Sequence, residues 1–260
     1  MSEPIVESVN LNGEECRVWR KGAGAKLVFF PGHGGMPKWI PFLDNLAEHF
    51  EIIVPSLPGF PGAGGLHFLD HHMDWVLAAR DLIDGAGIGP DALFAGSGPG
   101  ASLAAEIAAL WPESVARLAL ISPWGLFDDA DPTTDPWSAK APDLGALMCA
   151  DPSNWDEFRA TPEGANSVEW SIEQTRALEA SARIFWPLGD TRLNRRLGRI
   201  KCPTLYLRGD ADRIIPESYG EKFRHGISGP VSIDSIPGAG HLVELDCPEE
   251  TARLITSFMG

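Results

Sequence analysis

Short strand-like segments alternate with helix-like segments along most of this chain. Asn12-Gly13 joins the first two strand-like segments and is typical of a hairpin turn. Stretches with helical spacing of apolar residues separate most of the later strand-like segments. The strand-like segments cover residues 5–9, 16–19, 26–30, 51–55, 91–95, 117–122, 204–208 and 231–236. Strands that alternate with helices favour a parallel sheet covered on both faces. The sequence therefore predicts an α/β fold with a mostly parallel sheet of about eight strands flanked by helices.

Size and charge restrict the classes of partner that this chain can have. Its 260 residues are 44% hydrophobic, enough for one large α/β domain with an insertion. The 36 acidic and 21 basic residues leave a net charge of −15, which disfavours binding to nucleic acid or to an anionic membrane. We expect a small-molecule partner, and the formation of a homo-oligomer stays open.

The cysteines and the N-terminus indicate the cellular compartment. The cysteines are scattered without a C-x-x-C pair and predict free thiols; they are Cys16, Cys149, Cys202 and Cys247. Met1–Asn10 is polar and lacks the basic segment and apolar core of a signal peptide. No apolar run reaches the roughly 18 residues that a membrane span needs. These features predict a cytoplasmic protein.

Residues 124–200 differ in composition from the rest of the chain. The segment opens with an acidic, proline-rich stretch and then has helical spacing with several tryptophans. It is too long for a simple connection between two strands. We therefore expect residues 124–200 to form a helical lid (cap) on an α/β core made of residues 1–123 and 201–260. Its tryptophans either pack a small core of their own or line a pocket; the pocket candidates are Trp124, Trp137 and Trp186.

A turn rich in small residues follows the strand-like segment 91–95. The run Ala95-Gly96-Ser97-Gly98-Pro99-Gly100 has the shape of the G-x-S-x-G elbow, in which a sharp strand-to-helix turn exposes a nucleophile at the edge of a sheet. Two registers are open. If Gly96 and Gly100 flank the centre, the central residue is Gly98, which has no side chain. If Ser97 is central, the nucleophile is present but displaced.

Two further polar residues follow strand-like segments near the end of the chain. Asp212 lies after segment 204–208, and His241 lies after segment 231–236. Ligands of open α/β sheets bind at the carboxyl edge of the strands, where both residues are expected beside the elbow. Asp212 can hold His241 in one tautomer and leave its other nitrogen free as a general base. Asp210 is the weaker acid candidate, because turn hydrogen bonds commonly occupy such a residue.

The motifs together resemble those of the α/β-hydrolase-fold superfamily, in its lid-bearing branch of C–C bond hydrolases and small esterases. The likeness covers nearly the whole chain and rests on Phe30 to Gly35, Pro55 to Phe60, Gly96 to Ala101, Gly209 to Pro216 and Gly238 to His241. It implies a Ser-Asp-His triad, no cofactor, and cleavage of esters, amides or activated carbon–carbon bonds. It assigns Asp212 as the triad acid and His241 as the base, with one oxyanion donor near His33 or Gly34.

The elbow departs from the pattern of the resembled family. Members carry a proline near the end of the helix after the nucleophile, and counting back from Pro112 gives Gly98 as the expected nucleophile position. The usual second oxyanion donor is the N–H of the next residue, but Pro99 has none. In the Ser97 register that donor is Gly98, which is competent. Spacing therefore favours an absent nucleophile, whereas oxyanion chemistry favours Ser97.

Four interpretations of the site follow. In the first, the natural protein is a hydrolase and residue 98 was changed from serine. In the second, Ser97 is a displaced nucleophile. In the third, His241 and Asp212 act as a base without acylation, and in the fourth, the chain is an inactive ligand-binding homologue. Hydrolysis of a small, largely hydrophobic carbonyl substrate such as an ester, lactone or activated C–C bond is the leading expectation. A cofactor-free base catalyst and a binding protein are the alternatives.

No cofactor or metal is expected. His71 and Asp74 are three residues apart, but no further ligand follows at a matching spacing. The glycines at 96, 98 and 100 do not form a dinucleotide-binding G-x-G-x-x-G unit in the opening strand and helix. A tryptophan-rich lid suits a small to medium, hydrophobic or aromatic substrate.

Overall fold

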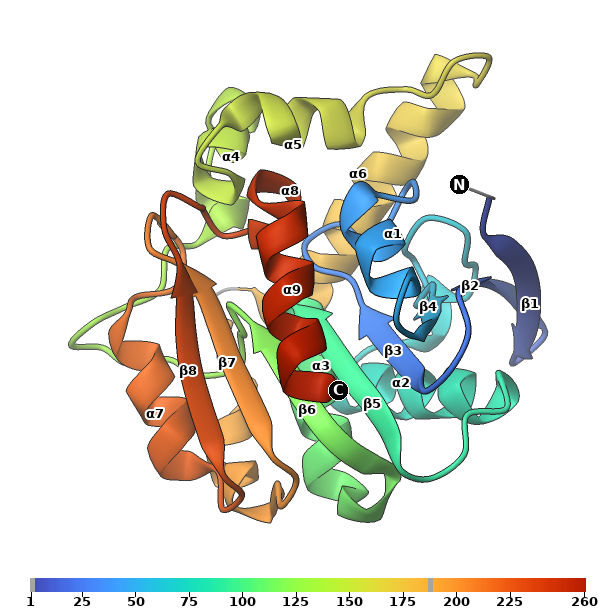
Figure 1. The fold of residues 1–260 in the computed structure, drawn as a ribbon. Coiled ribbons are helices and arrows are strands. Elements are labelled where there is room, and N and C mark those ends of the chain that lie inside the picture. Colours follow the sequence, from blue (N-terminus) through green and yellow to red (C-terminus); the bar gives the residue numbers. More distant parts are fainter. Residues whose placement is uncertain (1–2, 187–188) are drawn as a thin grey trace.

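The computed structural model describes residues 3–186 and 189–260, and eight strands form one sheet in that part of the chain (Figure 1). Their order across the sheet is β1-β2-β4-β3-β5-β6-β7-β8. The first pairings are antiparallel, and β4, β3, β5, β6, β7 and β8 run parallel. The strands are β1 (Ile5–Leu11), β2 (Glu14–Lys21), β3 (Lys26–Phe30), β4 (Glu51–Pro55), β5 (Ala92–Ser97), β6 (Val115–Ile121), β7 (Thr204–Gly209) and β8 (Val231–Ile236). The predicted α/β sheet is confirmed.

Helices cover both faces of this sheet. On one face α1 packs against α9, and on the other face α2 packs against α3 (Figure 1). The helices outside the predicted cap are α1 (Pro41–Ala47), α2 (His72–Gly85), α3 (Pro99–Leu110), α7 (Ser218–Gly226), α8 (Val243–Asp246) and α9 (Pro248–Met259). The central strands are apolar on both sides because they are buried between the two helix layers; β5 is buried along its whole length.

In the described part of the segment between β6 and β7, three α-helices extend beyond the carboxyl ends of the strands (Figure 1). They are α4 (Ala141–Met148), α5 (Pro152–Arg159) and α6 (Ser167–Phe185). They fall within the segment predicted as a lid, and a lid function stays a prediction. No helix in the described ranges is both long and apolar enough to span a membrane.

Two helix boundaries differ from the sequence prediction. Apolar residues have helical spacing over residues 39–50, but α1 covers only Pro41–Ala47. It begins at Pro41 because proline is tolerated at the first helical position and the preceding Ile40 is extended. The stretch near 67–85 divides into a 3-10 turn, Leu66–Phe68, and α2. Asp74 accepts from the backbone N–H of His71 and so defines the start of α2.

The turn between β5 and α3 depends on two glycines. A Cβ on Gly100 would lie 2.2 Å from the carbonyl oxygen of Phe30 on β3, and a Cβ on Gly96 would lie 2.6 Å from Gly100. Neither distance is tolerable for real atoms, so α3 can approach the sheet this closely only without side chains there. The close approach sets where residue 98 projects at the sheet edge.

We predict that Gly100→Ala lowers the free energy of unfolding by about 3 kcal/mol. The gain of about 1 kcal/mol from better helix propensity cannot offset a clash with the β3 backbone. Gly89→Ala is the matched control, because a Cβ there meets nothing within 4 Å. Chemical denaturation of both variants tests this, and equal stabilities would refute the close-approach argument.

Candidate active site

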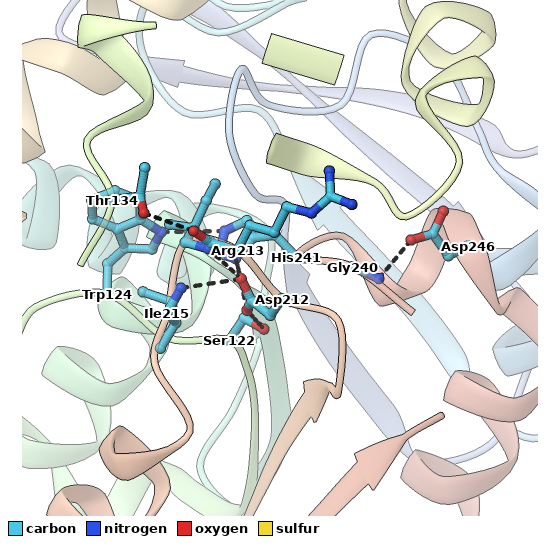
Figure 2. A network of polar contacts seen from close by, with 10 residues as sticks. Ser122, Trp124, Thr134, Asp212, Arg213, Ile215, Gly240, His241 and Asp246 are labelled. Carbon is cyan, nitrogen blue, oxygen red and sulfur yellow. Dashed lines mark hydrogen bonds and ion pairs between the residues drawn. The ribbon is translucent and has the colours of Figure 1, made fainter. Parts of the chain in front are cut away.

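The loops after β7 and β8 bring Asp212 and His241 together at the carboxyl edge of the sheet (Figure 2). Asp212 Oδ2 lies 3.1 Å from His241 Nδ1, and both side chains are fully buried. Parallel neighbouring strands end at the same edge, which is why residues 29 positions apart in the chain meet here.

Asp212 is held by more than His241. Its Oδ1 accepts hydrogen bonds from the backbone N–H groups of Ile214 (2.8 Å) and Ile215 (3.1 Å), and its Oδ2 accepts one from the Ser122 hydroxyl (2.8 Å). Burial raises the pKa of the Asp212 carboxyl, but His241 and the two N–H groups outweigh it and hold this pKa below its ordinary value. An ionised Asp212 accepts the Nδ1–H of His241 and leaves Nε2 as an acceptor.

Trp124 supplies the donor to that second nitrogen. Its indole Nε1–H donates to His241 Nε2 at 3.3 Å, and the two rings meet edge to face with centroids 6.3 Å apart (Figure 2). The backbone N–H of Trp124 also donates to the carbonyl oxygen of Gly98. Trp124 is therefore tied both to the elbow and to the candidate base.

Gly98 stands between β5 and α3 and faces the same nitrogen. Its φ of 49° and ψ of −116° lie where glycine is tolerated and other residues are strained. A Cβ built on Gly98 would lie 3.2 Å from His241 Nε2 and 3.5 Å from the Trp124 ring. Pro99 is the first residue of α3 and offers no backbone N–H to this space.

Ser97 lies elsewhere. Its hydroxyl is fully buried against the loop that carries His33, 3.1 Å from where a Cβ of Gly32 would be. The hydroxyl also lies close enough to the Glu244 carboxyl to lower the pKa of Glu244. No hydrogen bond joins Ser97 to His241 among the described residues. The structure thus brings Gly98, Asp212 and His241 together, and it does not bring Ser97 to them.

An aromatic cluster covers the candidate base. The His33 ring lies 5.3 Å from Trp137 and 6.3 Å from Trp155, and Trp137 lies 5.2 Å from Trp124. Trp186, the third tryptophan expected at the pocket, is 60% exposed at the end of α6 and is not part of the cluster. Its position after the last helical turn explains the exposure.

Two polar atoms of the cluster have no hydrogen-bond partner within the described residues. They are His33 Nδ1 and Trp137 Nε1, and both are buried. Nearby, the backbone N–H of Gly34 donates to the Ser181 hydroxyl of α6 at 3.3 Å. Burial, together with the neighbouring charges of His241 and Arg159, lowers the pKa of His33 to about 3. His33 is therefore a neutral group packed beside the rings of Trp137 and Trp155.

Two residues of the candidate site, Ser122 and Trp155, could not be predicted from the sequence. Ser122 turns towards Asp212 because it adopts a positive φ of 42°, which no sequence pattern announces in a serine. Trp155 joins the cluster from α5 through packing alone. Asp210, the weaker acid candidate, accepts the N–H of Gly238 at 2.6 Å, as expected for a turn residue. Within the described part of the chain, no group of three or more candidate ligands could hold a metal ion.

A family model described as the alpha/beta hydrolase family matches residues 27–254. The chain belongs to this family. Among curated relatives it is 26% identical to 2-hydroxy-6-oxo-6-phenylhexa-2,4-dienoate hydrolase of Comamonas testosteroni, covering 92% of this chain and 88% of the relative. It is 23% identical to 2-hydroxy-6-oxo-2,4-heptadienoate hydrolase of Pseudomonas putida, over 98% of this chain and 96% of the relative.

Solved structures share this fold. A meta-cleavage product hydrolase from Pseudomonas fluorescens, in complex with acetates, superposes with a TM-score of 0.78 at 18% identity, and 97% of each chain is covered. The 2-hydroxy-6-oxo-6-phenylhexa-2,4-dienoate hydrolase of a Rhodococcus species gives 0.77 at 20% identity over 99% of each chain. The relatives named as hydrolases identify this chain as a hydrolase-type enzyme.

We predict that His33→Phe makes the free energy of unfolding depend less steeply on pH below pH 6.5. With its pKa at about 3 instead of 6.5, folded His33 binds fewer protons than unfolded His33 between these values, so its burial makes stability fall as pH falls from 6.5. The variant should reduce the slope by up to about 1.4 kcal/mol per pH unit. Denaturation between pH 4 and 6 measures it, with Met36→Leu as a control in the same loop; unchanged slopes would contradict the assignment.

Proposed function

We propose that this chain hydrolyses a small, largely hydrophobic carbonyl substrate by general-base catalysis, without an acyl-enzyme intermediate. The observation that carries the proposal is the pairing of a buried Asp212–His241 contact with a residue that has no side chain, Gly98, at the point facing His241 Nε2. A base held in this way can take a proton from water, and no hydroxyl competes for the same nitrogen from the elbow.

In the proposed reaction, His241 Nε2 removes a proton from a water molecule while its oxygen attacks the substrate carbonyl carbon. The charge of Asp212 stabilises the imidazolium that forms. Collapse of the tetrahedral intermediate breaks the bond to the leaving group, which takes the proton back from His241. The net change is the addition of one water across the cleaved bond.

In this reaction, the O–H of the attacking water takes the position at His241 Nε2 that the Trp124 indole N–H occupies in the structure. The indole already donates to His241 Nε2 at 3.3 Å, so water or substrate reaches the base only when Trp124 gives up that hydrogen bond. Pro99 contributes no oxyanion donor, but His33 stays neutral and buried with an unpartnered ring nitrogen beside the cluster. We infer that the His33 ring N–H binds the carbonyl oxygen.

The proposed substrate class rests on the aromatic side chains near His241 and on the names of the relatives. The cluster of Trp124, Trp137 and Trp155 offers aromatic surface suited to a flat or apolar molecule. The relatives' names describe hydrolases of 6-oxo-dienoates, one with a phenyl group and one with a heptadienoate chain. An activated carbon–carbon bond next to a ketone, or an activated ester or lactone, is therefore the proposed target.

A ligand-binding role is the second candidate function. It is favoured by one observation, the hydrogen bond from Trp124 to His241, because this bond occupies the base and no side chain at residue 98 attacks. A binding protein would hold the same apolar carbonyl compounds and release them unchanged. Turnover of such a compound, measured as product formed per protein molecule, distinguishes the two roles.

We predict that the protein turns over an activated aryl ester or a 6-oxo-6-phenyl dienoate and gains no covalent adduct from a fluorophosphonate probe. His241→Ala should lower the rate by about 10²- to 10⁴-fold, since it removes the general base. Ser97→Ala and the exposed His225→Ala should retain activity as controls. Full turnover in His241→Ala, or a stoichiometric adduct on Ser97, would overturn the mechanism.

We also predict that Gly98→Ser does not create a serine hydrolase. The left-handed φ at this position costs a serine about 1–3 kcal/mol of stability. Trp124 still occupies His241 Nε2, and Pro99 still lacks an oxyanion donor. Intact-mass measurement after fluorophosphonate exposure should show no stoichiometric adduct. An adduct together with new ester turnover would instead identify residue 98 as a lost nucleophile.

A further inference from the structure

A cavity lies next to residues 38–41, which follow the loop that carries His33. It has a volume of about 280 Å³ and opens between the segment before α1, helix α5 and helix α8. Apolar side chains form much of its wall, among them Trp39, Ile40, Phe158 and Leu245. The volume is close to the lower limit of about 300 Å³ for small-molecule pockets, so it suits a compact ligand.

Glu244 forms the inner end of this cavity. Its side chain is 4% exposed, and its Oε2 has no hydrogen-bond partner in the described part of the chain. Glu244 also lines a chamber of only about 10 Å³, together with His33. That space matches one water molecule, so it is too small for a larger ligand of the neighbouring cavity.

The charges around Glu244 favour a cation. Burial is the main reason that the pKa of Glu244 is raised to about 6; the Ser97 hydroxyl lowers this pKa, and the neighbouring Asp246 carboxylate raises it further. Asp246 itself is fully occupied: it accepts from the N–H groups of Gly240 (2.8 Å; Figure 2) and Ala150 (2.7 Å) and from the Asn154 amide (2.8 Å). At neutral pH, Glu244 is thus a buried carboxylate beside a second one.

The other charged groups at the cavity do not neutralise Glu244. Lys38 lines the wall, but its ammonium donates to the backbone carbonyl of Glu157, and the Glu157 side chain adds another carboxylate. His241 lowers the pKa of Glu244, but its Nδ1 faces Asp212 and its Nε2 accepts from Trp124, so neither ring nitrogen is paired with Glu244. The Ser97 hydroxyl also lowers the pKa of Glu244, but it is a neutral donor and does not balance the charge. A buried carboxylate that no cation pairs with among the described residues costs stability, and the open side of the cavity is where a cation can enter.

We propose that this cavity binds a small primary amine with a compact apolar body. The ammonium group donates to the Glu244 carboxylate, and the apolar body packs against Phe158 and Trp39, whose rings also attract a cation. The site lies apart from Asp212 and His241 and does not depend on the proposed reaction.

Isothermal titration with benzylammonium chloride at pH 7.5 tests the proposal. Glu244→Gln keeps the shape of the side chain and removes its charge, so we expect it to weaken binding by about tenfold or more. Glu249→Gln, a carboxylate outside the cavity, should leave the affinity unchanged. Benzyl alcohol and benzoate should bind the wild type more weakly than benzylammonium. Equal affinity of Glu244→Gln and wild type would overturn the proposal.

Two further measurements place the ligand without relying on Glu244→Gln. Benzylammonium should shift the indole N–H signal of Trp39 in a nitrogen-resolved NMR spectrum and leave that of Trp124 in place. His241→Ala, which abolishes the proposed reaction, should bind benzylammonium as the wild type does. A shift at Trp124 only, or loss of binding in His241→Ala, would put the amine at the candidate base and overturn the assignment.

Discussion

The close packing of α3 on the sheet is the constraint on which the site depends. Gly96 and Gly100 let the helix start within contact of the β3 backbone, and this fixes residue 98 at the carboxyl edge. Because β7 and β8 run parallel to β5, the loops that follow them reach the same edge with Asp212 and His241. The geometry of an acid, a base and a third residue is therefore a property of the sheet. The third residue here is Gly98.

Three buried carboxylates, Asp212, Glu106 and Glu244, differ in how their charge is compensated in the interior of the protein. Asp212 is paired with His241 and with backbone donors. Glu106, on α3, is also fully buried; burial raises its pKa, but His72 and a two-point contact with Arg196, at 2.5 Å for each N–O pair, bring this pKa below its ordinary value. Glu244 is the exception: within the part of the chain that the structure describes, no cation is paired with it and its Oε2 has no hydrogen-bond partner. Glu244 thus differs from the two satisfied carboxylates in the way that a ligand-binding group does.

The sequence predicted the fold well because its signals are local. Alternating strands and helices, the Asn12-Gly13 turn and the glycines of the elbow each act over a few residues, and the structure has them where they were expected. The meeting of Asp212 with His241 was also predictable, since chain order and the shared sheet edge determine it. The partners of His241 and Asp212 were not. Trp124 and Ser122 reach the pair through backbone conformations after β6, including a positive φ at a serine, and no composition or spacing encodes these.

The ambiguity between Ser97 and Gly98 has a physical explanation in the structure. Successive residues of a strand point to opposite sides, so a slip of one position turns the hydroxyl of Ser97 away from His241 and towards Glu244. At Gly98 itself, His241 Nε2 has one lone pair in the ring plane, and the Trp124 N–H already uses it. A serine hydroxyl at residue 98 and the Trp124 indole would compete for that single acceptor. Glycine at 98 and tryptophan at 124 are thus complementary, and in the proposed reaction the base becomes available only when a substrate displaces the indole.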